Sequence, residues 1–371
     1  MTFVVTLTDA AGAGAVGGKA ASLGELARAG VAVPPGFAVT TEAFTAAMAA
    51  IDADGALRAG IEALPADDAA QVARVAARFR GVVAEAPLPS EVAAAVEAGY
   101  AGLGGASDVA VRSSATVEDS AEASFAGLQD TYLGVSGAAS VLDHVRRCWA
   151  SMYNDESVAY RRRLGLPEAG VAMAVVVQRM VAPRAAGVMF TRSPVTGDRS
   201  VVAIEGTWGL GSALVSGDVT PDSWVISKIT GEITARRVSP KVKIHRYVPN
   251  GSVALPAPTP GSCAGEAGPA GDPGGARVTV AETPADLRDT PCLSDDEIRS
   301  LAAVARRVEA HYAAPQDIEW ALLDGEAAPD ARIVLLQSRP ETVWAARDPK
   351  PAGAPKPRAA DHVLALFGKP L

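Results

Sequence analysis

The stretch VAVRSSATVEDSAEASFAGLQDTYLGV, residues 109–135, carries an arginine and a series of hydroxyl side chains between two β-like segments. Alternating apolar residues before Arg112 predict a strand, and Ser113, Ser114 and Thr116 follow it directly. An arginine fork beside hydroxyls and turn amides offers several donors to phosphate oxygens. The stretch has no histidine or cysteine that could act as a nucleophile. We therefore predict that it holds a polyphosphate and attacks nothing itself.

Small residues later in this stretch favour close approach of the backbone to a ligand. Ser124, Ala126 and Gly127 keep side-chain bulk low, so backbone N–H groups could reach phosphate oxygens as in a glycine-rich loop. The alternative is a surface β-hairpin whose hydroxyls favour turns, with Arg112 paired to Glu118 or Asp119.

Composition limits the class of protein. At 371 residues the chain is long enough for two domains or two lobes that share a cleft, and 49% of it is apolar. The net charge of −8 argues against a nucleic-acid partner, so an anionic ligand needs local cations. No apolar stretch is long enough to span a membrane. The three cysteines form no CxxC pair, so neither a zinc site nor a disulfide framework is indicated, and a cytoplasmic location is expected.

The order of patterns predicts a mixed α+β fold. Alanine-rich helical periodicity runs from about residue 41 to 103, and β-branched, turn-punctuated segments follow to about residue 227 with a helical interval near 137–163. Residues 249–275 are a Pro/Gly/Ala-rich loop, and Ser294 with Glu297 forms a capping box that starts a further helix. We expect an N-terminal lobe at 1–182, a C-terminal lobe at 183–345 and a Pro/Lys-rich linker with a short segment at 346–371.

The glycine-rich run GAGAVGGKAASLGEL, residues 12–26, imitates two nucleotide-binding motifs. Its first glycines match GxGxxG between a strand and a helix predicted at about 19–28, which would place a pyrophosphate on the helix dipole. The P-loop pattern fails because Ala13 and Ala20 occupy its glycine and hydroxyl positions. What remains is a glycine loop with Lys19 at the helix start, and the alternative is a flexible turn with a solvated lysine.

Two strand-like segments near the C-terminal end carry a third candidate. In DIEWALL, residues 317–323, alternation places Asp317 and Glu319 on one face, and in the segment RIVLLQSRP, residues 332–340, it does the same for Gln337 and Arg339. If the two segments form a hairpin, these groups share a surface. A carboxylate and an amide oxygen are suitable ligands for Mg²⁺, and the arginine could neutralise a transferring phosphoryl group. The alternative is an exposed sheet face with an Arg–Glu pair.

Five motifs in order resemble one family. They are residues 17–44, 109–135, 175–198 (VVVQRMVAPRAAGVMFTRSPVTGD), 206–222 (GTWGLGSALVSGDVTPD) and the pair DIEWALL and LLQSRPET. Together they resemble the N-terminal ATP-binding domain of phosphoenolpyruvate synthase, pyruvate phosphate dikinase and rifamycin phosphotransferase. The resemblance implies an ATP-grasp-like fold of two lobes with the cleft between them. It also implies that a carrier histidine attacks the β-phosphorus of ATP and that AMP leaves.

The resemblance also assigns roles to single residues. Catalytic roles fall on Lys19, Arg112 and Arg339, which contact or stabilise the phosphates, and Glu319 and Gln337 match the metal and nucleotide ligands. Gly127 and Thr131 match the loop over the phosphates, and Gln178, Met180 and Val181 match the place of the adenine. The implied cofactors are ATP and Mg²⁺.

Two departures from the family pattern shape the predicted function. Ser212 stands where the family commonly has the glutamate of GLGE, and none of the four histidines follows the Gly-Gly pair of the carrier motif. We therefore expect the ATP-binding subunit of a split dikinase, which phosphorylates a histidine on a separate subunit for transfer to a phenol, pyruvate or antibiotic hydroxyl. The alternatives are a non-catalytic nucleotide-binding regulatory or adaptor module and, from GxGxxG alone, a Rossmann dehydrogenase.

Overall fold

The computed structural model describes residues 1–64, 68–105, 107–115, 119–120, 123–124, 130–248, 277–342 and 344. The expected loop at 249–275, the C-terminal segment at 346–371 and Gly127 lie outside these described residues. Within them, helices and antiparallel sheets are mixed, which confirms the predicted α+β class. None of their helices combines the length and the apolar character that a membrane crossing requires.

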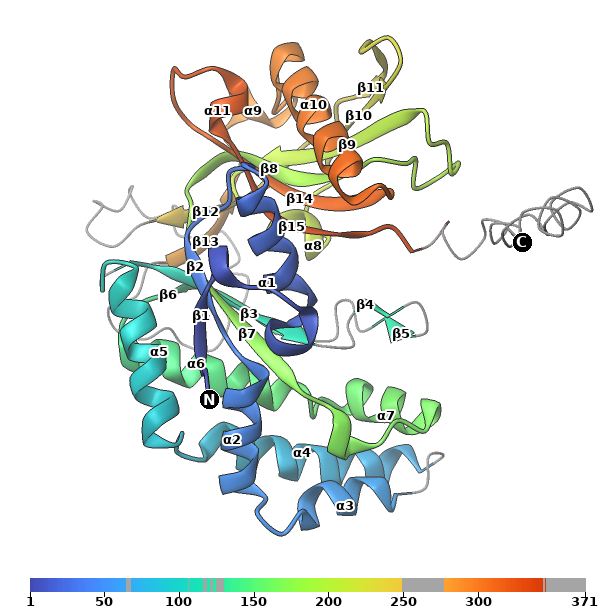
Figure 1. Ribbon diagram of the computed structural model, residues 1–371. Helices are drawn as coiled ribbons and strands as arrows, with labels where there is room; N and C mark the ends of the chain where they lie inside the picture. Colours follow the sequence, from blue (N-terminus) through green and yellow to red (C-terminus); the bar gives the residue numbers. More distant parts are fainter. Residues whose placement is uncertain are drawn as a thin grey trace, which may run out of the picture.

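A five-stranded antiparallel sheet organises the first half of the chain, in the order β1-β2-β7-β3-β6. Its main core packs α2–α7 against the sheet, with Trp149 completely buried and its indole N–H donating to the carbonyl of Met173 at 3.1 Å. Figure 1 shows these helices on the outer side of the sheet, away from the second half of the molecule. The strands are β1 (Val4–Thr6), β2 (Gly36–Val39), β3 (Val109–Ala115), β6 (Thr131–Val135) and β7 (Met173–Arg179), and the helices are α2 (Thr41–Ile51), α3 (Ala56–Glu62), α4 (Ala69–Glu85), α5 (Ser90–Gly102), α6 (Ala138–Ser151) and α7 (Asp155–Leu164).

A six-stranded antiparallel sheet organises the second half, in the order β11-β10-β9-β8-β14-β15. The apolar face of α10 covers one side of this sheet and buries Trp224 and Trp320 beneath it. The predicted capping box at Ser294 and Glu297 is present at the start of α10. The elements are β8 (Pro183–Phe190), β9 (Val201–Trp208), α8 (Ser212–Val215), β10 (Asp222–Ser227), β11 (Ile233–Arg237), α9 (Ala285–Arg288), α10 (Asp295–Tyr312), β14 (Gln316–Leu323), α11 (Pro329–Arg332) and β15 (Ile333–Pro340).

Smaller elements complete the fold. The hairpin of β12 (Lys243–Val248) and β13 (Arg277–Glu282) lies beside both sheets, since it contacts β9 and β6. Short pieces are β4 (Asp119–Ser120), β5 (Ala123–Ser124) and the 3₁₀ turns η1 (Leu7–Asp9) and η2 (Glu168–Gly170).

Helix α1 (Ala13–Arg28) lies between the two sheets in Figure 1 and joins them. Its Leu26 packs in the core under α10, although the helix also contacts β3 and β7 of the first sheet. The predicted helix from about residue 19 to 28 is present, and a short helical turn that begins at Ala13 precedes it. The glycine loop persists only as a kink at Gly17, where φ is 74° and ψ is 162°.

The kink at Gly17 depends on the missing side chain. A Cβ there would lie 2.0 Å from the carbonyl oxygen of Ser114, and φ is in the left-handed region. We predict that Gly17→Ala lowers the free energy of unfolding by about 1–3 kcal/mol, because it adds backbone strain and forces α1 away from β3. Thermal denaturation measures the change.

Gly14→Ala is the matched control for this substitution. Gly14 has ordinary helical backbone angles, and a Cβ there meets nothing within 4 Å. Alanine should leave stability unchanged or raise it by up to about 1 kcal/mol, because glycine is a poorer helix former. Equal effects of the two substitutions would contradict the specific role of Gly17.

Candidate functional site

The hairpin of β14 and β15 presents a polar row on one face of the second sheet. Asp317 lies opposite Arg339 and Glu319 lies opposite Gln337, as the alternation predicted. Ile318 and Trp320 point to the other face, into the core under α10. The carboxylate of Asp317 accepts hydrogen bonds from Nε and Nη2 of Arg339 at 2.8 and 2.7 Å. The four polar side chains therefore share the face that α10 leaves uncovered.

Arg112 reaches this row from the first sheet. Its Nη2 donates to Glu319 Oε2 at 2.7 Å and to Gln337 Oε1 at 3.1 Å, and its Nη1 donates to the carbonyl of Leu336 at 2.8 Å. The alternative, a local pair with Glu118 or Asp119, falls on residues whose side chains the structure does not describe. A single guanidinium thus joins residues more than 200 positions apart in the sequence.

Lys19 lies beside the same strand as Arg112. Its side chain is buried, and its Nζ donates to the carbonyl of Ser113 at 2.8 Å. The hydroxyl of Ser114 bonds to the carbonyl of Val16 at 3.1 Å and accepts from the amide of Ala20 at 3.3 Å. These bonds fix the kinked start of α1 on β3, so Lys19 enters the site from a rigid segment.

The charges of Lys19, Arg112, Asp317, Glu319 and Arg339, which with Gln337 form the polar cluster, act on the pKa values of the two acids. Burial favours the neutral acid at Glu319, but the adjacent Arg112, with Lys19 and Arg339 further away, holds the pKa of Glu319 below its ordinary value. At Asp317 burial dominates and raises the pKa, although Arg339 opposes this shift. Glu319 is therefore ionised at neutral pH and has cations around it. Its carboxylate can bind a metal ion only if Arg112 first moves away to pair with another anion, such as a phosphate.

The junction of the two sheets carries the residues expected near an adenine. Strand β7 ends at Arg179 and β8 begins at Pro183, so Met180 and Val181 lie in the three-residue connection. The amide of Met180 donates to the carbonyl of Asp108 at 2.9 Å. Gln178 is buried, and its Nε2 donates to the carbonyl of Pro34 at 3.1 Å.

The structure thus brings Lys19, Arg112, Glu319, Gln337 and Arg339 together. Thr131 pairs with Arg112 across β6 and β3, while Gln178, Met180 and Val181 lie at the sheet junction. The roles of all these residues toward a ligand stay predictions.

Two acidic residues on this face were not among the predicted site residues. The alternation placed Asp317 on the same face as Glu319, but no role was predicted for it. Glu205 pairs with Val188, which in turn pairs with Glu319, so it lies in the same row of the sheet. Its pKa is raised by burial. Only the strand order of the sheet reveals this position.

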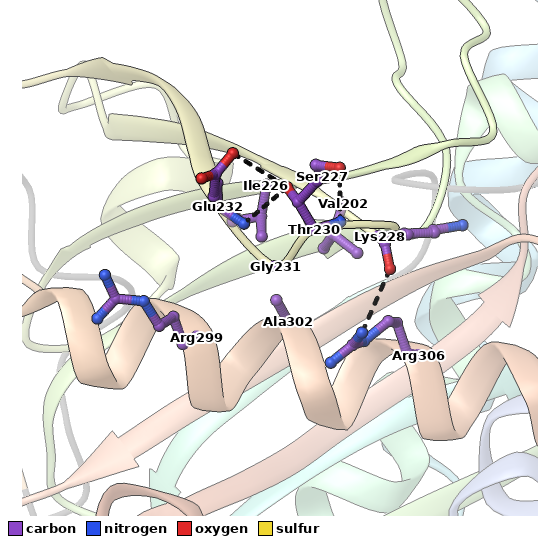
Figure 2. Close-up of a pocket in the computed structure, with 10 residues that line it drawn as sticks. All are labelled: Val202, Ile226, Ser227, Lys228, Thr230, Gly231, Glu232, Arg299, Ala302 and Arg306. Atoms are coloured by element: carbon purple, nitrogen blue, oxygen red, sulfur yellow. Dashed lines mark hydrogen bonds between the residues drawn. The ribbon is translucent and has the colours of Figure 1, made fainter.

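A separate pocket of about 380 Å³ lies on the opposite face of the second sheet. Figure 2 shows it between the β10–β11 turn and α10, where Nη1 of Arg306 donates to the carbonyl of Lys228 at 3.3 Å. Lys228 is already paired with Glu309 through Nζ at 2.6 and 2.8 Å. Because this pocket opens on the α10 side, it is not part of the polar cluster.

Comparison with known proteins decides the family. The family model described as "Pyruvate phosphate dikinase, AMP/ATP-binding domain" matches residues 13–359. The chain belongs to this family. The mixed fold described above is therefore an ATP-grasp-type nucleotide-binding domain, and the resemblance predicted from the five motifs is confirmed.

Relatives of this dikinase-family domain are longer proteins. The chain is 45% identical over 337 residues to a rifampicin phosphotransferase of a Streptomyces species, covering 90% of this chain and 35% of that protein. It is 42% identical over 337 residues to the phosphoenolpyruvate synthase of Aeropyrum pernix, covering 89% of this chain and 41% of that protein. The match thus spans about a third of one relative and about two fifths of the other.

Glu319 and Gln337 offer two oxygen atoms that could hold a metal ion. Among the described residues, no group of three or more His, Cys, Asp and Glu side chains is arranged to hold a metal ion. Glu319 Oε2 and Gln337 Oε1 nevertheless both lie within hydrogen-bond distance of one nitrogen of Arg112. Two hard oxygen ligands that converge on a cation fit Mg²⁺ that takes its remaining ligands from water and phosphate.

The depressed pKa of Glu319 has a consequence for stability. Because its ionised form is favoured in the folded state, its contribution is present above the ordinary value of 4.5 and is lost as pH falls below it. We predict that Glu319→Gln lowers the melting temperature at pH 7 and that the difference from the wild type shrinks toward pH 3. Thermal scans from pH 3 to 7 measure it. A difference that is constant with pH would contradict the ion pair with Arg112.

Proposed function

We propose that this chain binds Mg-ATP and phosphorylates a carrier histidine on a separate polypeptide, with release of AMP. The observation that supports the proposal best is the contact of Arg112 with both Glu319 and Gln337. It joins cations of the first lobe to oxygen ligands of the second around one site. A triphosphate needs such an arrangement, because its charge must be neutralised from several directions.

The cationic residues have distinct roles in this proposal. Lys19 and Arg112 hold the phosphate oxygens, and Arg339, released from Asp317, stabilises the phosphoryl group in transfer. A histidine nitrogen attacks the β-phosphorus, the bond between that phosphorus and the oxygen retained by AMP breaks, and the histidine then carries both the β- and γ-phosphoryl groups. Water attacks the γ-phosphorus of this diphosphoryl-histidine, so that inorganic phosphate leaves and the β-phosphoryl group stays on the histidine. Mg²⁺ on Glu319 and Gln337 would supply charge neutralisation across the phosphates. No residue of the cluster acts as a nucleophile.

The histidines of the chain support an acceptor supplied from elsewhere. Nδ1 of His144 lies 2.7 Å from the carbonyl oxygen of Ser140, and Nε2 of His311 lies 2.9 Å from Glu25 Oε1. His245 is buried, and His362 lies outside the described residues. The named activities of the relatives, phosphoenolpyruvate synthase and rifampicin phosphotransferase, suggest a small hydroxyl or enol acceptor for the onward transfer.

The proposal predicts AMP formation that depends on the cationic cluster. Purified chain with Mg-ATP and a histidine-carrier protein should form AMP, measured by chromatography of the nucleotides. Lys19→Met, Arg112→Met and Arg339→Met should each lower the rate by about 100-fold or more, because each removes a donor to the transferring phosphates.

Arg237→Met is the matched control and should leave the rate unchanged, because this exposed arginine lies on β11, at the edge of the sheet far from β15. Mg-ATP binding without AMP formation under any carrier condition would favour a non-catalytic regulatory or adaptor module. Failure to bind ATP at all would overturn the proposal.

A further inference from the structure

The segment after β9 crosses the face of the second sheet that carries Asp317, Glu319, Gln337 and Arg339, which we call the site face. The amide of Gly209 donates to the carbonyl of Arg184 at 2.8 Å, which extends the β9–β8 ladder by one residue. The chain then turns, and a Cβ on Gly211 would lie 3.7 Å from the Cβ of Ala186. Ala185 is part of the core under α10, so its neighbour Ala186 faces the opposite side. Ser212, the next residue, therefore starts α8 on the face that carries Glu319.

Ser212 lies level with the middle of β8, between the junction of the two sheets and Glu319. Strand β8 begins at Pro183, directly after the junction of the two sheets, and its Val188 is the neighbour of Glu319. Ala186 is about 10 Å along the strand from Pro183 and about 7 Å from Val188, at about 3.3 Å per residue. A nucleotide with its base at the junction and its phosphates at the cationic cluster would place its sugar at this level.

A chain of polar contacts orients the hydroxyl of Ser212. Its Oγ lies 3.0 Å from Nδ1 of His245, and Nε2 of His245 lies 3.3 Å from Oδ2 of Asp218. The histidine is fixed by its backbone, because the amide of Leu210 donates to its carbonyl at 2.8 Å. Gly209 is required at this crossing, since a Cβ there would lie 2.3 Å from the same carbonyl oxygen.

The protonation of His245 decides which way the serine hydroxyl points. Burial lowers the pKa of His245, although Asp218 opposes the shift, so the ring is neutral near pH 7. Nε2 of His245 makes no hydrogen bond of good geometry, but the Asp218 carboxylate 3.3 Å away favours the tautomer with its hydrogen on Nε2, in which Nδ1 accepts the hydroxyl hydrogen of Ser212. The lone pairs of Ser212 Oγ remain available to accept a hydrogen bond from a ligand.

We propose that Ser212, positioned by His245 and Asp218, accepts a hydrogen bond from a ribose hydroxyl of the bound nucleotide and thereby selects ribonucleotides over deoxyribonucleotides. The proposal rests on the nucleotide binding put forward under the proposed function, and it adds the group that recognises the sugar. His245 and Asp218 act as positioning residues, because they reach the sugar only through Ser212.

The test is a comparison of nucleotides rather than of activity. Calorimetry with the full chain and Mg²⁺ measures the dissociation constants of ATP, 2′-deoxy-ATP and 3′-deoxy-ATP. We expect the wild type to bind ATP about tenfold more tightly than one of the deoxy nucleotides, as for one hydrogen bond. Ser212→Ala should weaken ATP binding about tenfold and leave that deoxy nucleotide unaffected, so the discrimination disappears.

Two further variants separate orientation from folding. His245→Gln should reduce the discrimination while the deoxy nucleotide still binds as before, because the serine loses its fixed acceptor. Ser227→Ala, at the end of β10, is the matched control and should bind all three nucleotides as the wild type does. Wild-type chain that binds the three equally, or Ser212→Ala that weakens all three equally, overturns the inference and leaves the proposed function standing. Wild-type chain that binds none of them overturns both.

Discussion

The hydrogen bonds of Arg112 are the contact on which the arrangement of the site depends. Its guanidinium extends from β3 of the first sheet to the second sheet. There it donates hydrogen bonds to a carboxylate, an amide oxygen and a backbone carbonyl on β14 and β15. A planar group with donors in a fixed fork can satisfy three acceptors at once, which a lysine ammonium cannot do with the same directional precision. The side chain is mostly buried, with 12% of its surface exposed, so this bridge is only weakly screened by solvent.

Helix α1 supports this bridge, because it packs against both sheets. Its kink at Gly17 presses the helix against Ser114, which brings Lys19 to the strand that carries Arg112. The same helix hydrogen-bonds the second sheet, since Ser22 Oγ donates to the carbonyl of Ser338 at 2.7 Å. The glycine-rich run therefore allows α1 to pack closely on its neighbours, in addition to any contact that it makes with a ligand. Its small residues allow a helix to lie closely against two sheets.

The site face is also asymmetric along its length. One end, at β14 and β15, is strongly charged, whereas the middle of β8, at the level of Ala186, offers a neutral acceptor through Ser212 and His245. This order matches the chemistry of a nucleotide, whose phosphates need cations and whose sugar needs hydrogen-bonding partners without a net charge. The distribution of polar groups thus agrees with a ligand that lies along β8, from the sheet junction to the β14–β15 hairpin.

Local periodicity was sufficient for part of this description. The alternation around Glu319 and Gln337 predicted their shared face, and the capping box at Ser294 predicted where α10 starts. These features depend on residues close in sequence, where backbone geometry alone fixes which side chains are neighbours. The helical turn before Gly17 was not predicted, because a glycine run predicts a loop unless tertiary packing holds it in a helix.

The sequence by itself determined the fold class, the elements and the family of this chain, because hydrophobic periods and five ordered motifs are local properties. Only the tertiary structure decided that Arg112 pairs with Glu319, more than 200 residues away, and that Ser212, His245 and Asp218 meet. Such contacts depend on strand order and on the packing of α1 between two sheets, and no spacing along the chain encodes them directly. The physical reason is that charge and hydrogen-bond complementarity act over a few ångströms in space, whatever the separation in sequence.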